Sequence, residues 1–565
     1  MASRSLDRLL ARLDGAKRRF GPGEAEKTER LLAALERRKI SDAGSLVRLH
    51  EALLFLRAYP GSPGILRCVE RLLGAFFGRM SQLGPGDAGV DAENPEISGI
   101  AGTECSAILS YEVVRRLAEL HPREIEIDWD RYEIGDRLAG TWRLILPLLE
   151  EDSLVEAHVP YLEWLRAARA RREAELSWLI RRLDSLPIEA KEREGLWNAL
   201  ELPMRWRLGD SPASRTLMCR PVRRVFYHDG PLIARSEVSL AEELASPPLP
   251  VEKLSAAEGR AVLDMALETS AVRYRELHGF TYGDPARLYR ARAGRGVEVF
   301  VGGVPPERRL PLRAYHAALI FKNGVPVGYF ETLTLFERME VGFNVYYTFR
   351  EGESAWLFAR LLRLFRQLLG VSCFSIDPYQ IGHENKEAID SGAFWFYRKL
   401  GFRPVLAEVQ ALLEEEERKL RRDPAYRTPP QILRRLAAGH LVYEMPGTRQ
   451  GDWDRFHVRD VGIAVARQMA EQFNSDAAKM RAATAAALAR ALGAPAGSGA
   501  AFKTFAQVLS LVPDLDRWSA RDKRLLGEVI RAKDAAEETG YVRLMQRHAR
   551  LREAILALGS VRPPA

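Results

Sequence analysis

The chain has 565 residues, of which 47% are hydrophobic and 28% are charged, so a largely disordered protein is excluded and several globular units are expected. Its 84 Lys and Arg residues exceed the 76 Asp and Glu residues by a margin too small to indicate a nucleic-acid partner. Charged residues interrupt every apolar stretch before it reaches the ~18 residues of a membrane-spanning helix, and the first residues lack the apolar segment of a secretory signal. We therefore expect a cytoplasmic protein without a membrane span.

The first 220 residues are predicted to be mainly α-helical. In residues 1–83, apolar residues recur at three- and four-residue spacing, as on one face of an amphipathic helix. A stretch rich in Gly, Pro and Asp at 84–102 indicates a long loop. Helical patterns then resume and, apart from one short strand-like alternation, continue to residue 220. We expect a helical N-terminal region over 1–83 and a second, mainly helical region over 84–220.

Residues 221–296 are expected to connect these helices to a β-rich region. Two short β-like runs flank Asp229-Gly230, a dipeptide favoured in tight hairpins. A proline-rich connector at 245–252 is followed by a well-formed helical pattern. This connecting α/β segment could also be the start of the domain that follows.

Residues 297–410 carry a mixed pattern of strands and helices. The part from 297 to 349 is rich in β-branched and aromatic residues, and Asn323-Gly324 is a hairpin signal, so three or four antiparallel strands are expected. A helix, a buried strand, a second helix and a further strand follow, which predicts a parallel strand after the first crossover. Residues 411–565 read as a helical C-terminal region with a flexible break at 494–502.

One candidate ligand site lies at residues 350–355, where a predicted strand meets the N-terminus of a predicted helix. Its sequence is R-E-G-E-S-A. The free backbone N–H groups and the positive dipole end of such a turn suit a pyrophosphate. Ser354 is equally consistent with an ordinary helix N-cap, so the turn alone does not establish a phosphate site.

A second motif lies in the stretch IDSGAFWFYRKLGFRPV at 389–405. This stretch resembles the last core helix of the GNAT superfamily of N-acetyltransferases, which typically reads A-x-x-x-Y-x-K-x-G-F. The resemblance covers residues 297–410 and implies an α+β fold with a GNAT-like mixed sheet, flanked by large mainly α-helical N-terminal and C-terminal regions. The residues that match the pattern are Ala393, Tyr397, Lys399, Gly401 and Phe402.

The resemblance implies an acyl-CoA-dependent N-acyltransferase. An acyl group, with acetyl expected, would pass from acetyl-CoA or another acyl-CoA to a small-molecule or peptide amine by direct attack on the thioester. Tyr397 would protonate the departing thiolate as general acid, although its aromatic neighbours equally fit core packing. The implied coenzyme-binding residues are Arg350, Glu351, Gly352, Glu353, Ser354, Ala355 and Asp390.

Direct attack also needs a neutral amine, so a base is expected on a strand that faces the cleft. Glu331 and Glu340 are the candidates. Glu331 is preferred because its neighbours are apolar and burial would raise the pKa of its carboxyl, while a solvent-facing glutamate on an amphipathic strand remains the alternative. The other residues expected in the substrate cleft, besides Glu340, are Asn344, Tyr346, Tyr347, Asp377 and Tyr379.

Two departures from the family pattern leave a second hypothesis open. The turn normally reads Q/R-x-x-G-x-G/A, whereas Phe349, Gly352 and Ser354 occupy those positions here, and Asp390 stands where an Asn is common. A non-catalytic GNAT-like binding or scaffold protein is therefore the alternative, and transfer of a bulkier group is a third option. The sequence shows no metal-site spacing and no nucleotide-binding loop. The helical flanks would shape the acceptor site or bind a protein partner.

Overall fold

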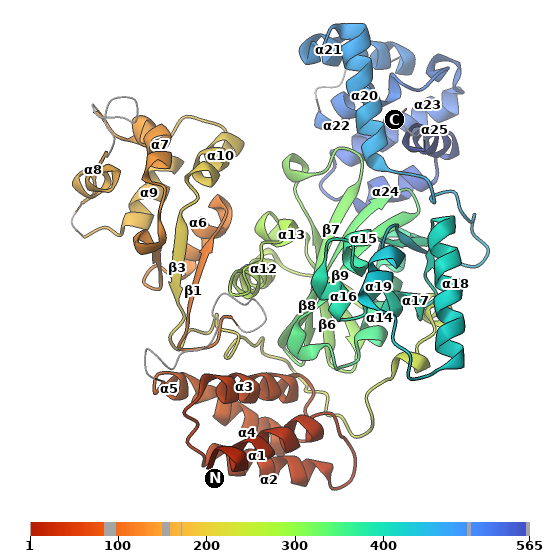
Figure 1. Cartoon of the computed structure of the whole chain (residues 1–565). Helices are drawn as coiled ribbons and strands as arrows, with labels where there is room; N and C mark the ends of the chain where they lie inside the picture. The colour runs from red at the N-terminus through yellow and green to blue at the C-terminus, as the bar shows by residue number, and fades with distance from the viewer. Residues whose placement is uncertain (1, 84–97, 150–158, 171, 494–498, 561–565) are drawn as a thin grey trace.

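The computed structural model describes residues 2–83, 98–149, 159–170, 172–493 and 499–560. Four units follow one another along the chain: a helical N-terminal unit, a small α/β unit, a large mixed sheet with helices on both faces, and a helical C-terminal unit (Figure 1). The expected α+β class with a mixed sheet is confirmed. Residues 84–97 of the expected loop and 494–498 of the expected break lie outside the described residues.

The N-terminal unit is a group of helices packed through leucine-rich faces. On α2 the buried residues Leu31, Leu32 and Leu35 repeat at the three- to four-residue spacing seen in the sequence. Helix α3 is buried along most of its length, because α1 and α4 cover one side of it and the central sheet lies against another. The helices are α1 Ala2–Ala16, α2 Glu24–Glu36, α3 Ala43–Ala58, α4 Pro63–Gly74 and α5 Phe76–Met80.

A small α/β unit with its own core follows. Its three short strands pair antiparallel in the order β1-β3-β2, so a region predicted to be mainly helical also contains a sheet. Trp142, Trp178 and Trp197 are buried in its core. The elements are β1 Glu104–Ile108, α6 Tyr111–Leu120, β2 Ile125–Ile127, α7 Leu138–Ile145, α8 Tyr161–Ala168, α9 Glu175–Asp184, α10 Ala190–Leu200 and β3 Pro203–Arg207.

The largest unit is built on a nine-stranded sheet in the order β11-β12-β10-β9-β8-β7-β6-β5-β4. Neighbouring strands are antiparallel except β9 and β10, which are parallel because a helix crosses over between them. The predicted hairpin at Asn323-Gly324 is confirmed, and both residues have the positive φ that its turn requires. The strands are β4 Val251–Lys253, β5 Tyr289–Gly294, β6 Val297–Gly303, β7 Ala314–Lys322, β8 Val325–Leu335, β9 Arg338–Val345, β10 Cys373–Ile376, β11 Arg403–Pro404 and β12 Leu441–Glu444.

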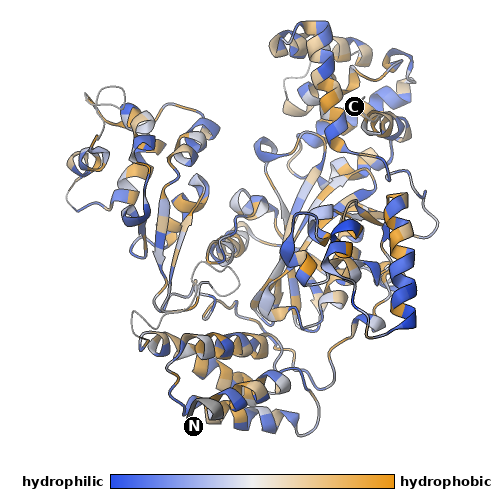
Figure 2. Ribbon diagram, in the orientation of Figure 1, coloured by the Kyte–Doolittle hydropathy of each residue, from blue (hydrophilic) through white to orange (hydrophobic). Residues whose placement is uncertain are grey.

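Helices cover both faces of this sheet, and β7 is therefore buried along its whole length. Phe330 of β8 meets Phe358 and Phe365 of α14 on one face, while Leu319 and Phe321 of β7 join α12 and α13 in a core on the other. Figure 2 shows hydrophilic residues along the outer side of α18. The helices are α11 Leu240–Ala245, α12 Ala256–Ala271, α13 His278–Thr281, α14 Ser354–Leu369, α15 Pro378–Ile381, α16 Lys386–Asp390, α17 Ala393–Arg398, α18 Ala407–Arg422 and α19 Pro430–Leu436.

The prediction of two short strands around Asp229-Gly230 is wrong, because residues 221–234 form no strand. The backbone N–H groups of this segment bond to groups that are not part of a strand pairing. The N–H of Phe226 donates to Asn323 Oδ1 at 2.8 Å, and the N–H of His228 donates to a carbonyl of the N-terminal unit. The segment therefore runs between the N-terminal unit and the central sheet without joining either as a strand.

The prediction that residues 411–565 are helical throughout is also wrong, because β12 forms a strand inside that range. β12 lies between β10 and β11 and pairs antiparallel with both, so the sheet-bearing unit extends well beyond residue 410. Three apolar and aromatic residues in a row followed by a glutamate carry no clear period, and only pairing with the distant β10 decides their conformation.

The C-terminal unit is a set of helices that contacts the central sheet through α24, which packs against α14 and β8. The last residues of the expected flexible break form the first turn of α22. None of the helices in the described ranges combines the length and the apolar character that crossing a bilayer demands. The helices are α20 Val458–Phe473, α21 Ala477–Leu492, α22 Ala500–Leu509, α23 Ala520–Lys533, α24 Thr539–Gln546 and α25 Ala549–Gly559.

Candidate functional site

The parallel strands β9 and β10 separate near the middle of the sheet. Their pairing ends at Ile376, which lies opposite Val341. There β10 stops and the chain turns into α15, whose first turn is capped by the side chain of Asp377, whereas β9 continues to Val345 alongside β8. We call the place where the two strands part the β9/β10 cleft.

The register of β8 and β9 places the predicted carboxylates on one face of the sheet. Glu331 lies opposite Gly342, and Glu340 and Asn344 follow two residues from Gly342 in either direction. Side chains opposite each other or two apart share a face, so all three point to the side covered by α12 and α13. A β-carbon at Gly342 would meet Gln380 Nε2 no closer than 3.9 Å, so the glycine leaves room beside the cleft.

Glu331 is a partly buried carboxyl with a raised pKa, as a general base requires. The hydroxyl of Tyr315 donates to its Oε1 at 2.5 Å. Burial raises the pKa of Glu331, and the hydrogen bond from Tyr315 and the nearby His278 only partly oppose that effect. Its carboxylate therefore takes up a proton more readily than an exposed glutamate would.

Glu340 has the opposite electrostatic character although it lies on the same face. Burial pushes the pKa of Glu340 upward, but the hydrogen bond from His440 and the guanidinium groups of Arg338 and Arg313 outweigh it and lower the pKa. His440 Nε2 lies 3.5 Å from Glu340 Oε2, and the two arginines lie 3.7 and 3.6 Å from its oxygens. Glu340 is therefore held in its ionised form.

A cavity of about 550 Å³ extends from these residues towards the start of the C-terminal unit. His440 Nε2 also lies 3.6 Å from Asp377 Oδ2, so one imidazole bridges two carboxylates at the cavity wall. Glu340, Asp377 and His440 each offer an atom within 4.8 Å of the others, a spacing that could hold a divalent cation. Arg313 and Arg338 compete for the oxygens of Glu340, which disfavours binding of a divalent cation there. The mixture of charges suits the binding of a charged organic group instead.

The remaining predicted cleft residues divide into buried and exposed ones. Tyr346 is 6% exposed, with the guanidinium of Arg273 4.0 Å above its ring. Within the described part of the chain, the hydroxyl of Tyr346 and the Oδ1 of Asn344 are buried without a hydrogen-bond partner. Tyr347 and Tyr379 are 53% and 55% exposed. Asn344 and Tyr346 thus present unused polar atoms near the cleft, while the two exposed tyrosines lie at the surface.

Tyr397 lies on the opposite face of the sheet, in the aromatic core under α14. Its ring is edge-on to Phe358 at 5.4 Å and to Phe402 at 5.8 Å. Burial raises the pKa of Tyr397, so the phenol stays protonated at neutral pH. The predicted acid and the predicted base thus lie on opposite faces of the sheet, and Tyr397 has the packing role that its sequence neighbours suggest.

The predicted pyrophosphate turn at the N-terminus of α14 is occupied by charges from the chain itself. Glu353 is the N-cap and is only 2% exposed. Its carboxylate pairs with Arg295 at 2.6 Å and Lys322 at 3.5 Å, and it accepts from the Ile233 N–H at 3.1 Å. The pKa of Glu353 is lowered because the Arg295 hydrogen bond and the Lys322 charge outweigh burial, which acts to raise it. Glu353 therefore serves the helix end as an internal anion.

The N-terminal unit covers the same turn. The hydroxyl of Tyr59 hydrogen-bonds to the backbone of Glu353, and a β-carbon at Gly352 would lie 2.5 Å from that hydroxyl. Glu351 pairs with Lys17 at 3.3 Å and with Arg18 at 3.0 Å. Part of the predicted phosphate cradle therefore already contacts the N-terminal helices.

The other residues predicted to bind coenzyme lie around this turn. Arg350 donates through Nε to the carbonyl of Val345 at 3.2 Å and pairs with Glu387. The Ser354 hydroxyl donates to the Arg350 carbonyl at 3.2 Å, so this side chain does not act as the N-cap. Ala355 is buried in the first turn of α14, and Asp390 is exposed at the end of α16.

Sequence reasoning missed His440, Arg338 and Arg313, which surround Glu340. His440 precedes β12, a strand that the sequence did not predict, and the arginines read as ordinary surface charges. No local pattern marks these residues, because each acquires its role by contact with a distant segment.

Comparison with protein-family models, with curated proteins and with solved structures finds no match for this chain. The strand geometry around Glu331 and Glu340 and the motif at 389–405 are therefore the features that bear on function.

Proposed function

We propose that the protein is an acyl-CoA-dependent N-acyltransferase of the GNAT type. The observation that carries the proposal is the point where β9 and β10 part, with Glu331 and Glu340 on one face of the sheet and Tyr397 in the aromatic core on the other face. The A-x-x-x-Y-x-K-x-G-F pattern that contains Tyr397 gives independent support. Acetyl is the expected acyl group, and the acceptor is an amine.

The two carboxylates suit different steps of one transfer. The ionised Glu340, at the wall of the 550 Å³ cavity, attracts the ammonium form of an acceptor. Glu331, whose pKa is raised by burial, takes the proton that the attacking nitrogen must lose. The nitrogen bonds to the thioester carbon, the carbon–sulfur bond breaks, and Tyr397 gives its phenolic proton to the departing thiolate.

The turn at the N-terminus of α14 supports a second candidate function. Backbone amides at 350–355 would hold the coenzyme pyrophosphate. The Tyr59 hydroxyl already contacts the backbone of Glu353, however, and the Glu353 carboxylate accepts a hydrogen bond from the Ile233 N–H next to the same turn. A chain that uses its own carboxylate at this position fits a GNAT-like binding or scaffold protein. Coenzyme binding requires either displacement of Tyr59 or a pyrophosphate position nearer to Arg350.

Calorimetry with acetyl-CoA and longer acyl-CoAs separates the two functions. We expect saturable binding of one of them and release of free thiol when a panel of amines is added. Lack of binding at millimolar coenzyme, by the wild type and by Tyr59→Phe alike, would leave the scaffold function standing.

Variants of the proposed acid and base then test the chemistry. Glu331→Gln should lower kcat by about 100- to 10,000-fold and remove the acid limb of the pH–rate profile. Tyr397→Phe should lower kcat with coenzyme affinity nearly intact. The matched controls are Glu298→Gln on β6 and Tyr443→Phe, whose ring contacts Phe402 on the other side, and both should retain turnover.

A further inference from the structure

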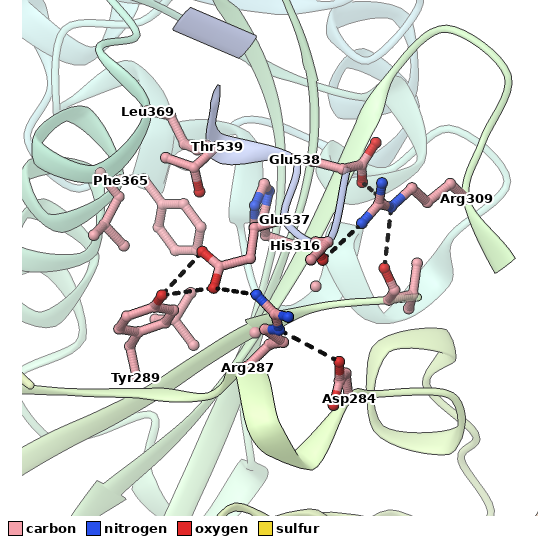
Figure 3. Close-up of a pocket in the computed structure, with 16 residues that line it drawn as sticks. Asp284, Arg287, Tyr289, Arg309, His316, Phe365, Leu369, Glu537, Glu538 and Thr539 are labelled. Carbon is pink, nitrogen blue, oxygen red and sulfur yellow. Dashed lines mark hydrogen bonds and ion pairs between the residues drawn. The ribbon is translucent and has the colours of Figure 1, made fainter. Parts of the chain in front are cut away.

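A second cavity, of about 210 Å³, shares no lining residue with the 550 Å³ cavity and lies between the β5–β7 end of the sheet, the C-terminal half of α14 and the segment that joins α23 to α24 (Figure 3). Its walls are largely apolar. They include Val301 and Val304 from the sheet and Phe365, Leu368 and Leu369 from α14. The cavity is larger than the ~150 Å³ space that accommodates a benzene molecule in a protein core.

The charged groups at the rim of this cavity are already paired with one another. The Tyr289 hydroxyl donates to both Glu537 oxygens at 2.8 and 2.9 Å, and Arg287 pairs with Glu537 at 3.3 Å. Arg309 donates to the last carbonyl of α23 and to two carbonyls of the α23–α24 segment, and the carboxylate of Glu538 pairs with a lysine of α23. These contacts, drawn in part in Figure 3, hold the segment over the cavity and leave no unpaired charge among the described residues that line it.

His316 supplies the polar group inside the cavity that these pairs do not use. It projects from β7, is only 7% exposed, and its ring packs edge-on against Phe365 at 6.5 Å. Its Nδ1 is buried and has no hydrogen-bond partner among the residues that the structure describes. Burial lowers the pKa of His316, so the imidazole is neutral at physiological pH. A buried nitrogen without a partner is costly, and a ligand that bonds to it removes that cost.

We propose that this cavity binds a small hydrophobic molecule with one hydroxyl group, of the size of a phenol carrying at most small substituents, whose hydroxyl bonds to His316 Nδ1. A hydroxyl both donates and accepts, so it satisfies either tautomer of the imidazole. The apolar walls take the ring, and the paired rim charges give no reason for a charged ligand to bind. This site is independent of acyl transfer, because it shares no residue with the β9/β10 cleft.

Phenol and toluene are a matched pair of probes, because they have nearly the same shape and differ in the hydroxyl. Titration of the full chain, followed by ligand-observed NMR and calorimetry, should show phenol binding about five- to tenfold more tightly than toluene, the ratio that one net hydrogen bond gives. Equal affinities would show that the hydroxyl finds no partner in the cavity, and lack of saturable binding of both probes would show that the cavity takes no aromatic ligand. Either result would overturn the proposal.

The variant His316→Leu keeps an apolar side chain of similar size and removes the nitrogen. It should bind toluene as well as or better than the wild type and lose the preference for phenol. A retained preference for phenol would place the hydroxyl on another group and contradict the assignment to His316. Should this variant fail to fold, judged by its circular dichroism spectrum, the wild-type comparison of phenol with toluene still decides.

Ligand occupancy should also stabilise the roof of the cavity. Ala536, Glu537, Glu538 and Thr539 line it from the α23–α24 segment, so a bound phenol should slow amide hydrogen exchange there. Exchange in the small α/β unit, which does not touch the cavity, is the internal control. A uniform change in both regions would point to non-specific binding of phenol and count against the site.

Discussion

The two ends of helix α14 are covered by different parts of the chain, and in different ways. At the N-terminal end, Glu353 is buried between Lys322 and Arg295 under the N-terminal unit. At the C-terminal end, Arg543 and Gln546 of α24 donate to the last carbonyls of the helix, with Gln546 Nε2 at 2.9 Å from the Leu369 carbonyl. Both helical flanks, which have no evident role in the sequence, thus complete the ends of one helix.

The charged side chain at each end of α14 has the sign that the helix dipole favours, but the desolvation cost differs between the two ends. A helix favours negative charge at its first turn and donors at its last turn. Burial lowers the pKa of Lys322 to about 8 although Glu353 lies beside it, so desolvation is a large cost at the N-terminal end. The contacts of Arg543 are exposed and carry no such cost. The N-terminal end should therefore be the more sensitive of the two.

The largest expected effect is the loss of the buried charge at the N-terminal end. Glu353→Gln should lower the free energy of unfolding by about 3 to 5 kcal/mol, because it leaves Lys322 and Arg295 without their anion. Urea denaturation followed by circular dichroism measures the change. The matched control is Glu351→Gln, an exposed partner of Lys17, which should cost less than about 1 kcal/mol. Equal effects of the two variants would remove the distinction between buried and exposed charge.

Acid should weaken the N-terminal end selectively. The pKa of folded Glu353 is below its unfolded value of about 4.5, so its contribution is present above that pH and is lost as the pH falls through the folded pKa. The difference in unfolding free energy between wild type and Glu353→Gln should therefore shrink below pH 4.5. Arg543 and Gln546 do not titrate there, so an Arg543→Ala difference should stay constant. A constant difference for Glu353→Gln would contradict the pairing.

A smaller effect is expected from the hydroxyl that contacts the Glu353 backbone. Tyr59→Phe keeps the ring, which stacks on Phe55, and removes the hydrogen bond, so it should cost about 1 kcal/mol. If the proposed coenzyme site uses this turn, the same variant should bind acetyl-CoA more tightly than the wild type. Unchanged coenzyme affinity would place the pyrophosphate away from the Glu353 amide.

The smallest effect is expected at the C-terminal end of α14. Arg543→Ala removes exposed donors to the carbonyls of Gln367 and Leu368 and should cost about 0.5 kcal/mol, which water partly compensates. Thermal unfolding followed by circular dichroism is sensitive enough to detect it. A loss comparable to that of Glu353→Gln would mean that the two ends contribute equally and would refute the comparison.

Local patterns in the sequence predicted much of the central sheet. The Asn323-Gly324 turn and the aromatic, β-branched runs on either side of it are sufficient to define β7 and β8, because a hairpin pairs neighbours in the chain. The same reasoning failed for β12, whose partner β10 lies some 70 residues earlier, and for the runs around Asp229-Gly230, whose donors bond to loops and side chains.

The site divides in the same way. Glu331, Glu340 and Tyr397 could be picked out because residue type, strand alternation and a short motif are properties of the local sequence. The position of His440 beside Glu340 and Asp377, and the capture of Glu353 by Lys322 and Arg295, could not be predicted. A lysine or an arginine in a sequence reads as solvated, and only folding brings it to a carboxylate in a buried place. The sequence alone thus identified which residues could act as acid, base or ligand. Their pKa values and the access to the N-terminal end of α14 depend on contacts between segments far apart in the chain, and these contacts exist only in the folded protein.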